Sequence, residues 1–221
     1  MCTVTYIPSD KGFILTANRD EFADRKPASF PNTRASKRGE VTFPADGDAG
    51  GTWIATSPSL TVSLLNGNYN RDPNITYRKS RGLVALDPFD FDSVDEYLEQ
   101  ANFEGINGFK MLLIEEEVLT EITWDGNQLT RESHKPEIPN IWVSIPKKFQ
   151  HILEWRKSAF RQFLTNNPKP NPSKIREFHQ IKTDPTGLGT QIEKNNMVFT
   201  VSMTQVRLEE KNPEISYCSF K

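Results

Sequence analysis

The amino-acid sequence predicts an α+β layered sandwich built on antiparallel sheets. Pairs of β-branched and apolar segments lie at both ends of the chain, each pair separated by a short turn-rich stretch. The amphipathic helical segments lie between these pairs, whereas a doubly wound parallel sheet would alternate single strands with helices. With 221 residues, 36% of them hydrophobic, the chain is long enough to bury a core of its own. We therefore expect a single domain over residues 1–221.

The first hairpin is predicted over residues 3–7 and 13–18, which are rich in β-branched and aromatic residues. The segment between them, Pro-Ser-Asp-Lys-Gly, suits a five-residue loop. Pairing Ile7 with Phe13 places Cys2 opposite Asn18, and alternation of side chains then puts Asp20 on their face. A shift of one residue would move Asp20 to the other face, so this prediction depends on the register.

Turn signals and apolar spacing predict the other strands. Residues 22–51 are polar and turn-rich, which predicts a long loop over the site. Further strands are predicted at 52–56, 60–65, 109–115, 118–124, 197–208 and 214–220. These form hairpins around the Ser57-Pro58-Ser59 and Asn212-Pro213 turns and at residues 116–117, and Asp125-Gly126 is a further turn signal.

Three helices are predicted between the first and last hairpins. Asp92 caps a short helix over 93–101, whose apolar residues fall on one face. Pro146 opens the clearest helix, with apolar residues three and four positions apart at Phe149, Ile152, Leu153, Phe160, Phe163 and Leu164. A proline-rich connector over 166–172 ends it, and Ser173 caps a third helix that reaches about residue 181. Residues 184–196 are predicted to be a loop.

Composition excludes several classes of function. The formal net charge is −2 with mixed signs, which argues against binding nucleic acid or a membrane surface. We expect neither a membrane span nor a signal peptide, because the chain lacks long apolar runs. Two cysteines are too few for a disulfide framework, so a cytoplasmic protein is expected. The three histidines lack metal-ligand spacing, and no phosphate loop or dinucleotide fingerprint is present.

Cys2 is the candidate nucleophile. Removal of Met1 would make Cys2 the first residue, so that one residue would carry a thiol and a free amine. That α-amine titrates near roughly pH 8, close enough to neutral to accept the thiol proton. Asp20 would position the amine, and Arg19 would stabilise the thiolate. The alternative is that Cys2 is simply a small buried residue at the start of a strand.

Several short motifs resemble one known family. They are Met1-Cys2-Thr3-Val4, residues 15–21 (LTANRDE), residues 49–54 (AGGTWI), Leu64-Leu65-Asn66-Gly67, residues 77–82 (YRKSRG) and Asn107-Gly108-Phe109. In this order and spacing the sequence resembles the NRDE family, which includes the transport and Golgi organisation 2 proteins. The resemblance covers the first half of the chain and weakens beyond about Val118. That family is similar to the cysteine N-terminal nucleophile hydrolases, which cleave linear amides and have a four-layer αββα sandwich with antiparallel sheets.

The resemblance also implies roles for residues beyond Cys2. Asn66 matches an asparagine that donates to the oxyanion in the related hydrolases, although Asn66-Gly67 is also a strong hairpin turn. Substrate contacts are expected from Asn18, Gly51, Trp53 and Arg81. Each has an alternative: Gly51 as part of a β-bulge, Trp53 as a core residue and Arg81 as a solvated charge.

Two departures from the family pattern lie in the second half of the chain. Where many members have a Ser-Asn pair, this sequence has Val143-Ser144-Ile145-Pro146, with no asparagine. The late Thr-Arg segment has no clear counterpart, because Arg207 lies too far beyond Thr200. A missing oxyanion donor can cost on the order of a hundredfold in rate.

Two functions remain open at this point. The first is a cysteine N-terminal nucleophile amidohydrolase that acts on a small linear amide after loss of Met1 and needs no cofactor or metal. The second is a non-catalytic carrier of a small ligand such as haem, with Cys2 as a soft axial ligand. Either function implies a small-molecule ligand as the binding partner.

Overall fold

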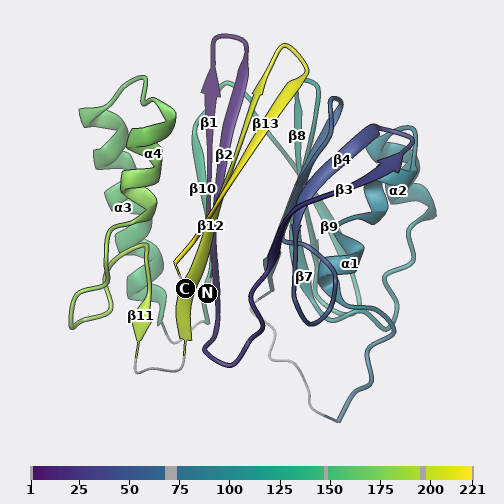
Figure 1. Cartoon of the computed structure of the whole chain (residues 1–221), viewed down its shortest axis with the longest axis horizontal. Helices are drawn as coiled ribbons and strands as arrows, with labels where there is room; N and C mark the ends of the chain where they lie inside the picture. Colours follow the sequence, from purple (N-terminus) through teal and green to yellow (C-terminus); the bar gives the residue numbers. More distant parts are fainter. Residues whose placement is uncertain (1, 68–73, 147–148, 195–197, 221) are drawn as a thin grey trace. The chain divides into compact units, whose positions relative to one another are not determined.

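The computed structural model describes residues 2–67, 74–146, 149–194 and 198–220. The chain forms two compact units, one from residues 1–25 and 139–221 and the other from residues 26–138. Each unit carries one antiparallel sheet, and the described residues include four α-helices (Figure 1). The single-domain organisation over residues 1–221 stays a prediction. No helix among the described residues is long and apolar enough to cross a membrane.

The first unit contains a six-stranded sheet, which we call sheet A. Its strands are β1 (Cys2–Ser9), β2 (Gly12–Phe22), β10 (Asn140–Ser144), β11 (Glu193–Lys194), β12 (Val198–Glu209) and β13 (Asn212–Ser219). The order is β10-β1-β2-β12-β11, and β13 also pairs with β12. β1 therefore lies between β2 and β10, so Cys2 has a neighbouring strand on either side.

Two helices lie along one face of sheet A: α3 (Gln150–Asn166) and α4 (Pro172–His179) (Figure 1). Ile7 and Ile14 pack against Phe160 and Phe178 from the helices, which fixes this face of the sheet as the helix-facing one. The two predicted helices are confirmed, but their starts differ from the prediction. α3 begins at Gln150, and the side chain of Asn171 caps α4 because Pro172 takes the first helical position.

The second unit contains a seven-stranded sheet, which we call sheet B. Its strands are β3 (Ser29–Ser36), β4 (Gly39–Ala45), β5 (Ile54–Thr56), β6 (Leu60–Asn66), β7 (Phe109–Glu115), β8 (Val118–Trp124) and β9 (Leu129–His134), in that order across the sheet. The predicted β5–β6 and β7–β8 hairpins are confirmed. A core of apolar side chains joins one face of this sheet to α1 (Arg81–Val84), the 3-10 turn η1 (Asp87–Asp90) and α2 (Val94–Gln100).

Several predicted boundaries in this unit are wrong. Residues 22–51 are not one long loop, because β3 and β4 form a hairpin there. β3 alternates exposed with half-buried residues and has no apolar run, so its composition resembles that of a loop. Ser93, not Asp92, caps α2: its hydroxyl accepts a hydrogen bond from the Glu96 N–H at 2.9 Å.

The register of the first hairpin also differs from the prediction. Thr3 pairs with Asn18, Ile7 with Ile14 and Ser9 with Gly12, one residue away from the predicted alignment. The predicted five-residue loop is therefore a two-residue turn at residues 10–11. Gly12 pairs with Ser9 and with Glu209 of β12, and only a glycine fits there, because a Cβ would lie 2.0 Å from the Leu208 carbonyl oxygen. The closing hairpin turns at residues 210–211, which have positive φ angles, and Asn212 and Pro213 lie in β13.

Candidate active site

Cys2 is the first residue of β1, and its side chain is 8% exposed. On one side it pairs with Ser144, the last residue of β10. On the other side, the end of β2 brings Asp20 next to Cys2, because the Asp20 backbone donates a hydrogen bond to the sulfur. The candidate nucleophile therefore lies at one end of sheet A, between two strands that come from distant parts of the sequence.

The observed register separates the side chains that were predicted to share a face. Thr3 and Thr5 point to the helices, since they contact Arg156 at 2.7 Å and His179 at 2.8 Å. Alternation along β1 then turns Cys2 to the opposite face of sheet A. Asn18 pairs with Thr3 and so belongs to the helix-facing side. The prediction that Cys2, Asn18 and Asp20 share one face is therefore wrong, and Arg19 is the β2 residue on the side of Cys2.

The environment of Cys2 opposes ionisation of its thiol. Burial raises the pKa of Cys2 above its ordinary value, and the nearby Asp20 carboxylate raises it further. The hydrogen bond from the Asp20 backbone acts in the opposite direction because it favours the thiolate. A reactive thiolate at this position thus requires a base beside the sulfur and a positive charge in its surroundings.

Asp20 is itself a buried carboxyl group. Its Oδ1 accepts a hydrogen bond from the Thr200 hydroxyl at 2.6 Å. Burial raises the pKa of Asp20, while the charge of Arg156 and the Thr200 hydrogen bond lower it, and the net shift is upward. The protein surroundings of Asp20 therefore raise its pKa, and shifted pKa values are common among residues of active sites.

Arg156 supplies the positive charge in these surroundings, and the sequence interpretation missed it. Its guanidinium is fully buried, and it donates to the Thr3 hydroxyl at 2.7 Å and to the Gly189 carbonyl at 2.8 Å. Burial lowers the pKa of Arg156, and the charges of Asp20 and Cys2 raise it. The sequence does contain a sign of this burial, which is an arginine at the spacing of the apolar residues. Arg156 lies four residues after Ile152 and four before Phe160, on the apolar face of the helix.

Arg19 and Asn18 have other contacts. Arg19 is nearly buried, and its guanidinium pairs with Glu21 at 3.6 Å, so part of its charge is neutralised by a carboxylate. Asn18 donates to the carbonyl oxygens of His179 at 2.8 Å and Thr190 at 2.9 Å. These contacts tie β2 to the helix layer, and they give Asn18 a structural role on the face away from Cys2.

The remaining predicted residues, Gly51, Trp53, Asn66 and Arg81, belong to the second unit. A Cβ at Gly51 would lie 2.3 Å from the Gly82 carbonyl carbon, so close backbone packing explains this glycine. Trp53 is buried, as its core alternative predicted. Arg81 begins α1 and donates to the Gly108 carbonyl at 3.2 Å.

Asn66 is the last residue of β6 and pairs with Phe109. The Gly67 N–H donates to the Gly108 carbonyl, so the chain continues along β7 at this point. The hairpin-turn interpretation of Asn66-Gly67 is therefore wrong, and its role as an oxyanion donor stays a prediction.

Two other polar clusters are accounted for by their own contacts. In the described chain, Glu121, Glu132 and His134 have potential metal-ligand atoms within 4.8 Å of one another. However, Glu121 is paired with Lys110 and lies 2.8 Å from the His134 ring, so Glu121 and His134 already have partners within the chain.

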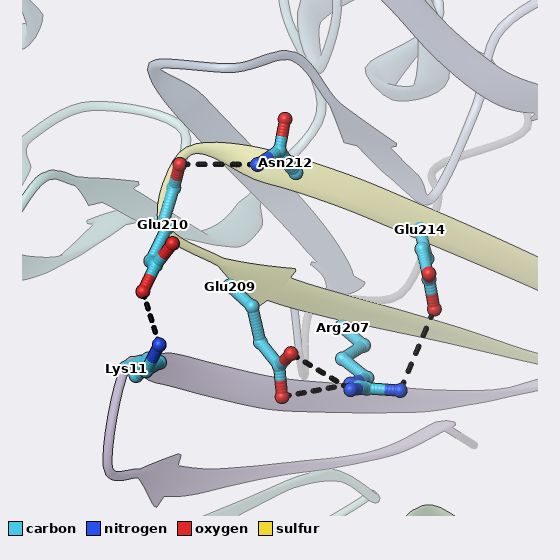
Figure 2. A pocket seen from close by; sticks show the side chains of 6 residues that line it. All are labelled: Lys11, Arg207, Glu209, Glu210, Asn212 and Glu214. Carbon is cyan, nitrogen blue, oxygen red and sulfur yellow. Dashed lines mark hydrogen bonds and ion pairs between the residues drawn. The ribbon is translucent and has the colours of Figure 1, made fainter.

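The second cluster lines a pocket at the β1–β2 and β12–β13 turns, at the other end of sheet A from Cys2. Figure 2 shows Lys11 paired with Glu210, and Arg207 placed between Glu209 at 2.7 Å and Glu214 at 3.6 Å. The charges in this pocket are thus largely matched with one another.

Comparison with known proteins identifies the fold and the family. No curated protein matches the chain by sequence. Among solved structures, the chain is similar to a penicillin V acylase from Agrobacterium tumefaciens, with a TM-score of 0.54 and 11% identity over 100% of this chain and 86% of that one. This similarity confirms the N-terminal nucleophile hydrolase type of fold. The family model named Transport and Golgi organisation 2 matches residues 1–209, well beyond the first half of the chain, and the chain therefore belongs to that family.

Proposed function

We propose that this protein is a cysteine N-terminal nucleophile amidohydrolase that acts on a small linear amide after Met1 is removed. The observation that carries the proposal is the surroundings of Cys2. A thiol at the start of β1 lies beside the buried carboxyl of Asp20, and the buried guanidinium of Arg156 interacts with the charges of both. Buried charges around a potential nucleophile are typical of active sites.

The proposed reaction uses the chain's own groups. The free α-amine of Cys2 takes the thiol proton, and the sulfur attacks the amide carbonyl carbon to form a C–S bond. The carbonyl electron pair moves to oxygen, and it returns when the C–N bond breaks and the amine leaves with the proton. Water then hydrolyses the thioester and releases the acid. Asp20 positions the α-amine, and Arg156 offsets the negative charge that forms on sulfur.

Arg156 joins Arg19 in this proposal as a cation near the thiolate. Arg19 lies on the side of Cys2 but is shared with Glu21, and the charge of Arg156 acts from the helix-facing side of the sheet. The fold match to a penicillin V acylase supports acyl-group chemistry, because that enzyme has the same type of fold.

The alternative function is a carrier of a small ligand such as haem. An axial cysteine binds iron as the thiolate, so this role needs the same ionised sulfur as the hydrolase. Burial raises the pKa of the Cys2 thiol in both cases, and the experiment below separates the two functions.

The decisive experiment compares protein that begins at Cys2 with protein that retains Met1. Both are treated with penicillin V and with a panel of N-acyl amides, and intact mass and product release are followed. We expect acylation and turnover only in the processed form. Cys2→Ser should lower turnover by more than about a thousandfold. Asp20→Asn, which keeps an oxygen for Thr200, should lower it by about a hundredfold.

Equal reaction of the Met1-retaining form would exclude the amine as the base. If no member of the panel acylates Cys2, while haem titration gives a Cys2-dependent absorbance change, the carrier function replaces this proposal.

A further inference from the structure

We propose that the hydroxyl of Ser144 is a catalytic group that donates a hydrogen bond to the oxyanion formed at Cys2. This inference rests on the proposed hydrolase function and adds a residue to the site. It starts from the sheet register, in which Ser144 and Cys2 are direct partners across β1 and β10. Side chains of directly opposed residues in an antiparallel pair have Cβ atoms about 4.5–5.5 Å apart.

The two side chains share a face by two independent observations. On β1, Thr3 contacts Arg156 and so points to the helices, which turns Cys2 to the opposite face. On β10, Ile141 and Val143 pack in the apolar cluster under the same helices, which turns Ser144 to the opposite face as well. The hydroxyl and the thiol are therefore neighbours on the face of sheet A away from α3 and α4.

The position is also suited to contact with a substrate. Ser144 ends β10 where Cys2 begins β1, and Ser144 is half-buried, so part of its surface is exposed. The next residue, Ile145, is buried and its side chain has no hydrogen-bond donor. Ser144 is the β10 residue that pairs with Cys2, so its side chain is the β10 donor opposite Cys2.

The hydroxyl is suited in type and position to an oxyanion formed at the sulfur. When sulfur bonds to a carbonyl carbon, the oxygen lies two bonds beyond the sulfur, on the face of sheet A that Ser144 shares with Cys2. A hydroxyl is a hydrogen-bond donor that can reorient, so it can donate to this oxygen as negative charge develops. Ser144 donates and retains its proton, and the bonds broken and formed at the carbonyl are those of the reaction above.

The test separates reactions that form an oxyanion from those that do not. Protein beginning at Cys2 is acylated with p-nitrophenyl acetate, which forms a tetrahedral oxyanion, and alkylated with iodoacetamide, which forms none. We expect Ser144→Ala to slow acylation by about ten- to a hundredfold while alkylation is unchanged. Ser144→Thr keeps the hydroxyl and should restore most of the acylation rate. Ser144→Asn, which offers an amide donor, should also exceed the alanine variant.

Three results would overturn the proposal. Unchanged acylation in Ser144→Ala shows that the hydroxyl does not contact the oxyanion. An equal loss of acylation and alkylation shows that Ser144 acts on the structure or exposure of Cys2. Absence of acylation in the unaltered protein, with normal alkylation, refutes the hydrolase function and this role with it. The first two results leave the hydrolase proposal standing, so the two failures are distinguishable.

Discussion

The region around Cys2 and the β3–β4 hairpin differ in how deeply their charged and titratable side chains are buried. Near Cys2, Asp20, Arg156 and His179 are all buried, and Arg156 and His179 each retain a ring or guanidinium nitrogen with no hydrogen-bond partner within the described structure. On the hairpin, Lys37 is partly exposed and forms an ion pair with Asp92 at 2.9 Å. The groups near Cys2 are buried at a cost, whereas the charge of Lys37 on the hairpin stays in contact with water, where it costs little.

The difference follows from the free-energy cost of burying charged and polar groups. A hairpin ion pair between exposed side chains adds at most a small amount of stability and is easily replaced. A buried arginine, carboxyl and histidine destabilise the fold unless each is well compensated, so they are typical of sites whose chemistry needs them. The two regions therefore make different predictions under mutation and under a change of pH.

The largest expected effect is at Arg156. Arg156→Met removes two hydrogen bonds and leaves the Asp20 carboxyl without its buried counter-charge. We expect the free energy of unfolding to fall by about 3–5 kcal/mol, because two buried hydrogen bonds from a charged group are lost. Urea denaturation measures it. Arg161→Met, an exposed arginine on the same helix, is the matched control and should change stability little. Equal losses in both variants would contradict the argument.

His179 gives the next largest effect, through pH. Burial, with a contribution from the charge of Arg156, lowers its pKa to about 3. The unfolded chain binds a proton below about pH 6.5, whereas the folded chain stays neutral until about pH 3, so stability falls as pH drops through this window. At pH 4.5 the loss is about 2–3 kcal/mol relative to pH 7.5.

Asp20 titrates with the opposite sign, because its raised pKa makes the folded state bind the proton first. The unfolding free energies of the wild type and of His179→Gln must therefore be compared at both pH values, with His151→Gln as the exposed control. The comparison isolates His179. If the glutamine variant keeps the full loss at acid pH, the assignment to His179 is wrong.

Local sequence pattern predicted the elements that have strong signals. The β5–β6 and β7–β8 hairpins and both long helices follow from apolar spacing and turn residues, and the structure confirms them. β3 was missed because its polar residues alternate between solvent and a half-buried face, which leaves no apolar run. The predicted register of the first hairpin was wrong by one residue because Gly12, taken as a turn residue, pairs with Glu209 of β12, nearly 200 residues away.

The candidate site also combines residues that the sequence predicted with residues that only the tertiary structure brings together. Cys2 and Asp20 were identified from their position and their resemblance to a family, and they do lie together. Arg156 and Ser144 reach the site through the packing of α3 and the pairing of β10, which no local pattern specifies. A charged residue on the apolar face of a helix is nevertheless a usable signal, because burying it requires a partner. Arg156 meets that description.

The smallest effect separates two adjacent residues of the hairpin turn. Arg38 is largely buried, its Nε donates to the Phe91 carbonyl at 2.7 Å, and it forms an ion pair with Glu115. Arg38→Ala should lower the free energy of unfolding by about 1.5–3 kcal/mol, as expected for hydrogen bonds to a charged group. Lys37→Ala removes only an exposed pair and should leave the urea midpoint unchanged, most clearly at high salt. If the two losses are equal, exposed pairs do hold this hairpin, and the burial of a charged side chain no longer predicts how much its removal destabilises the fold.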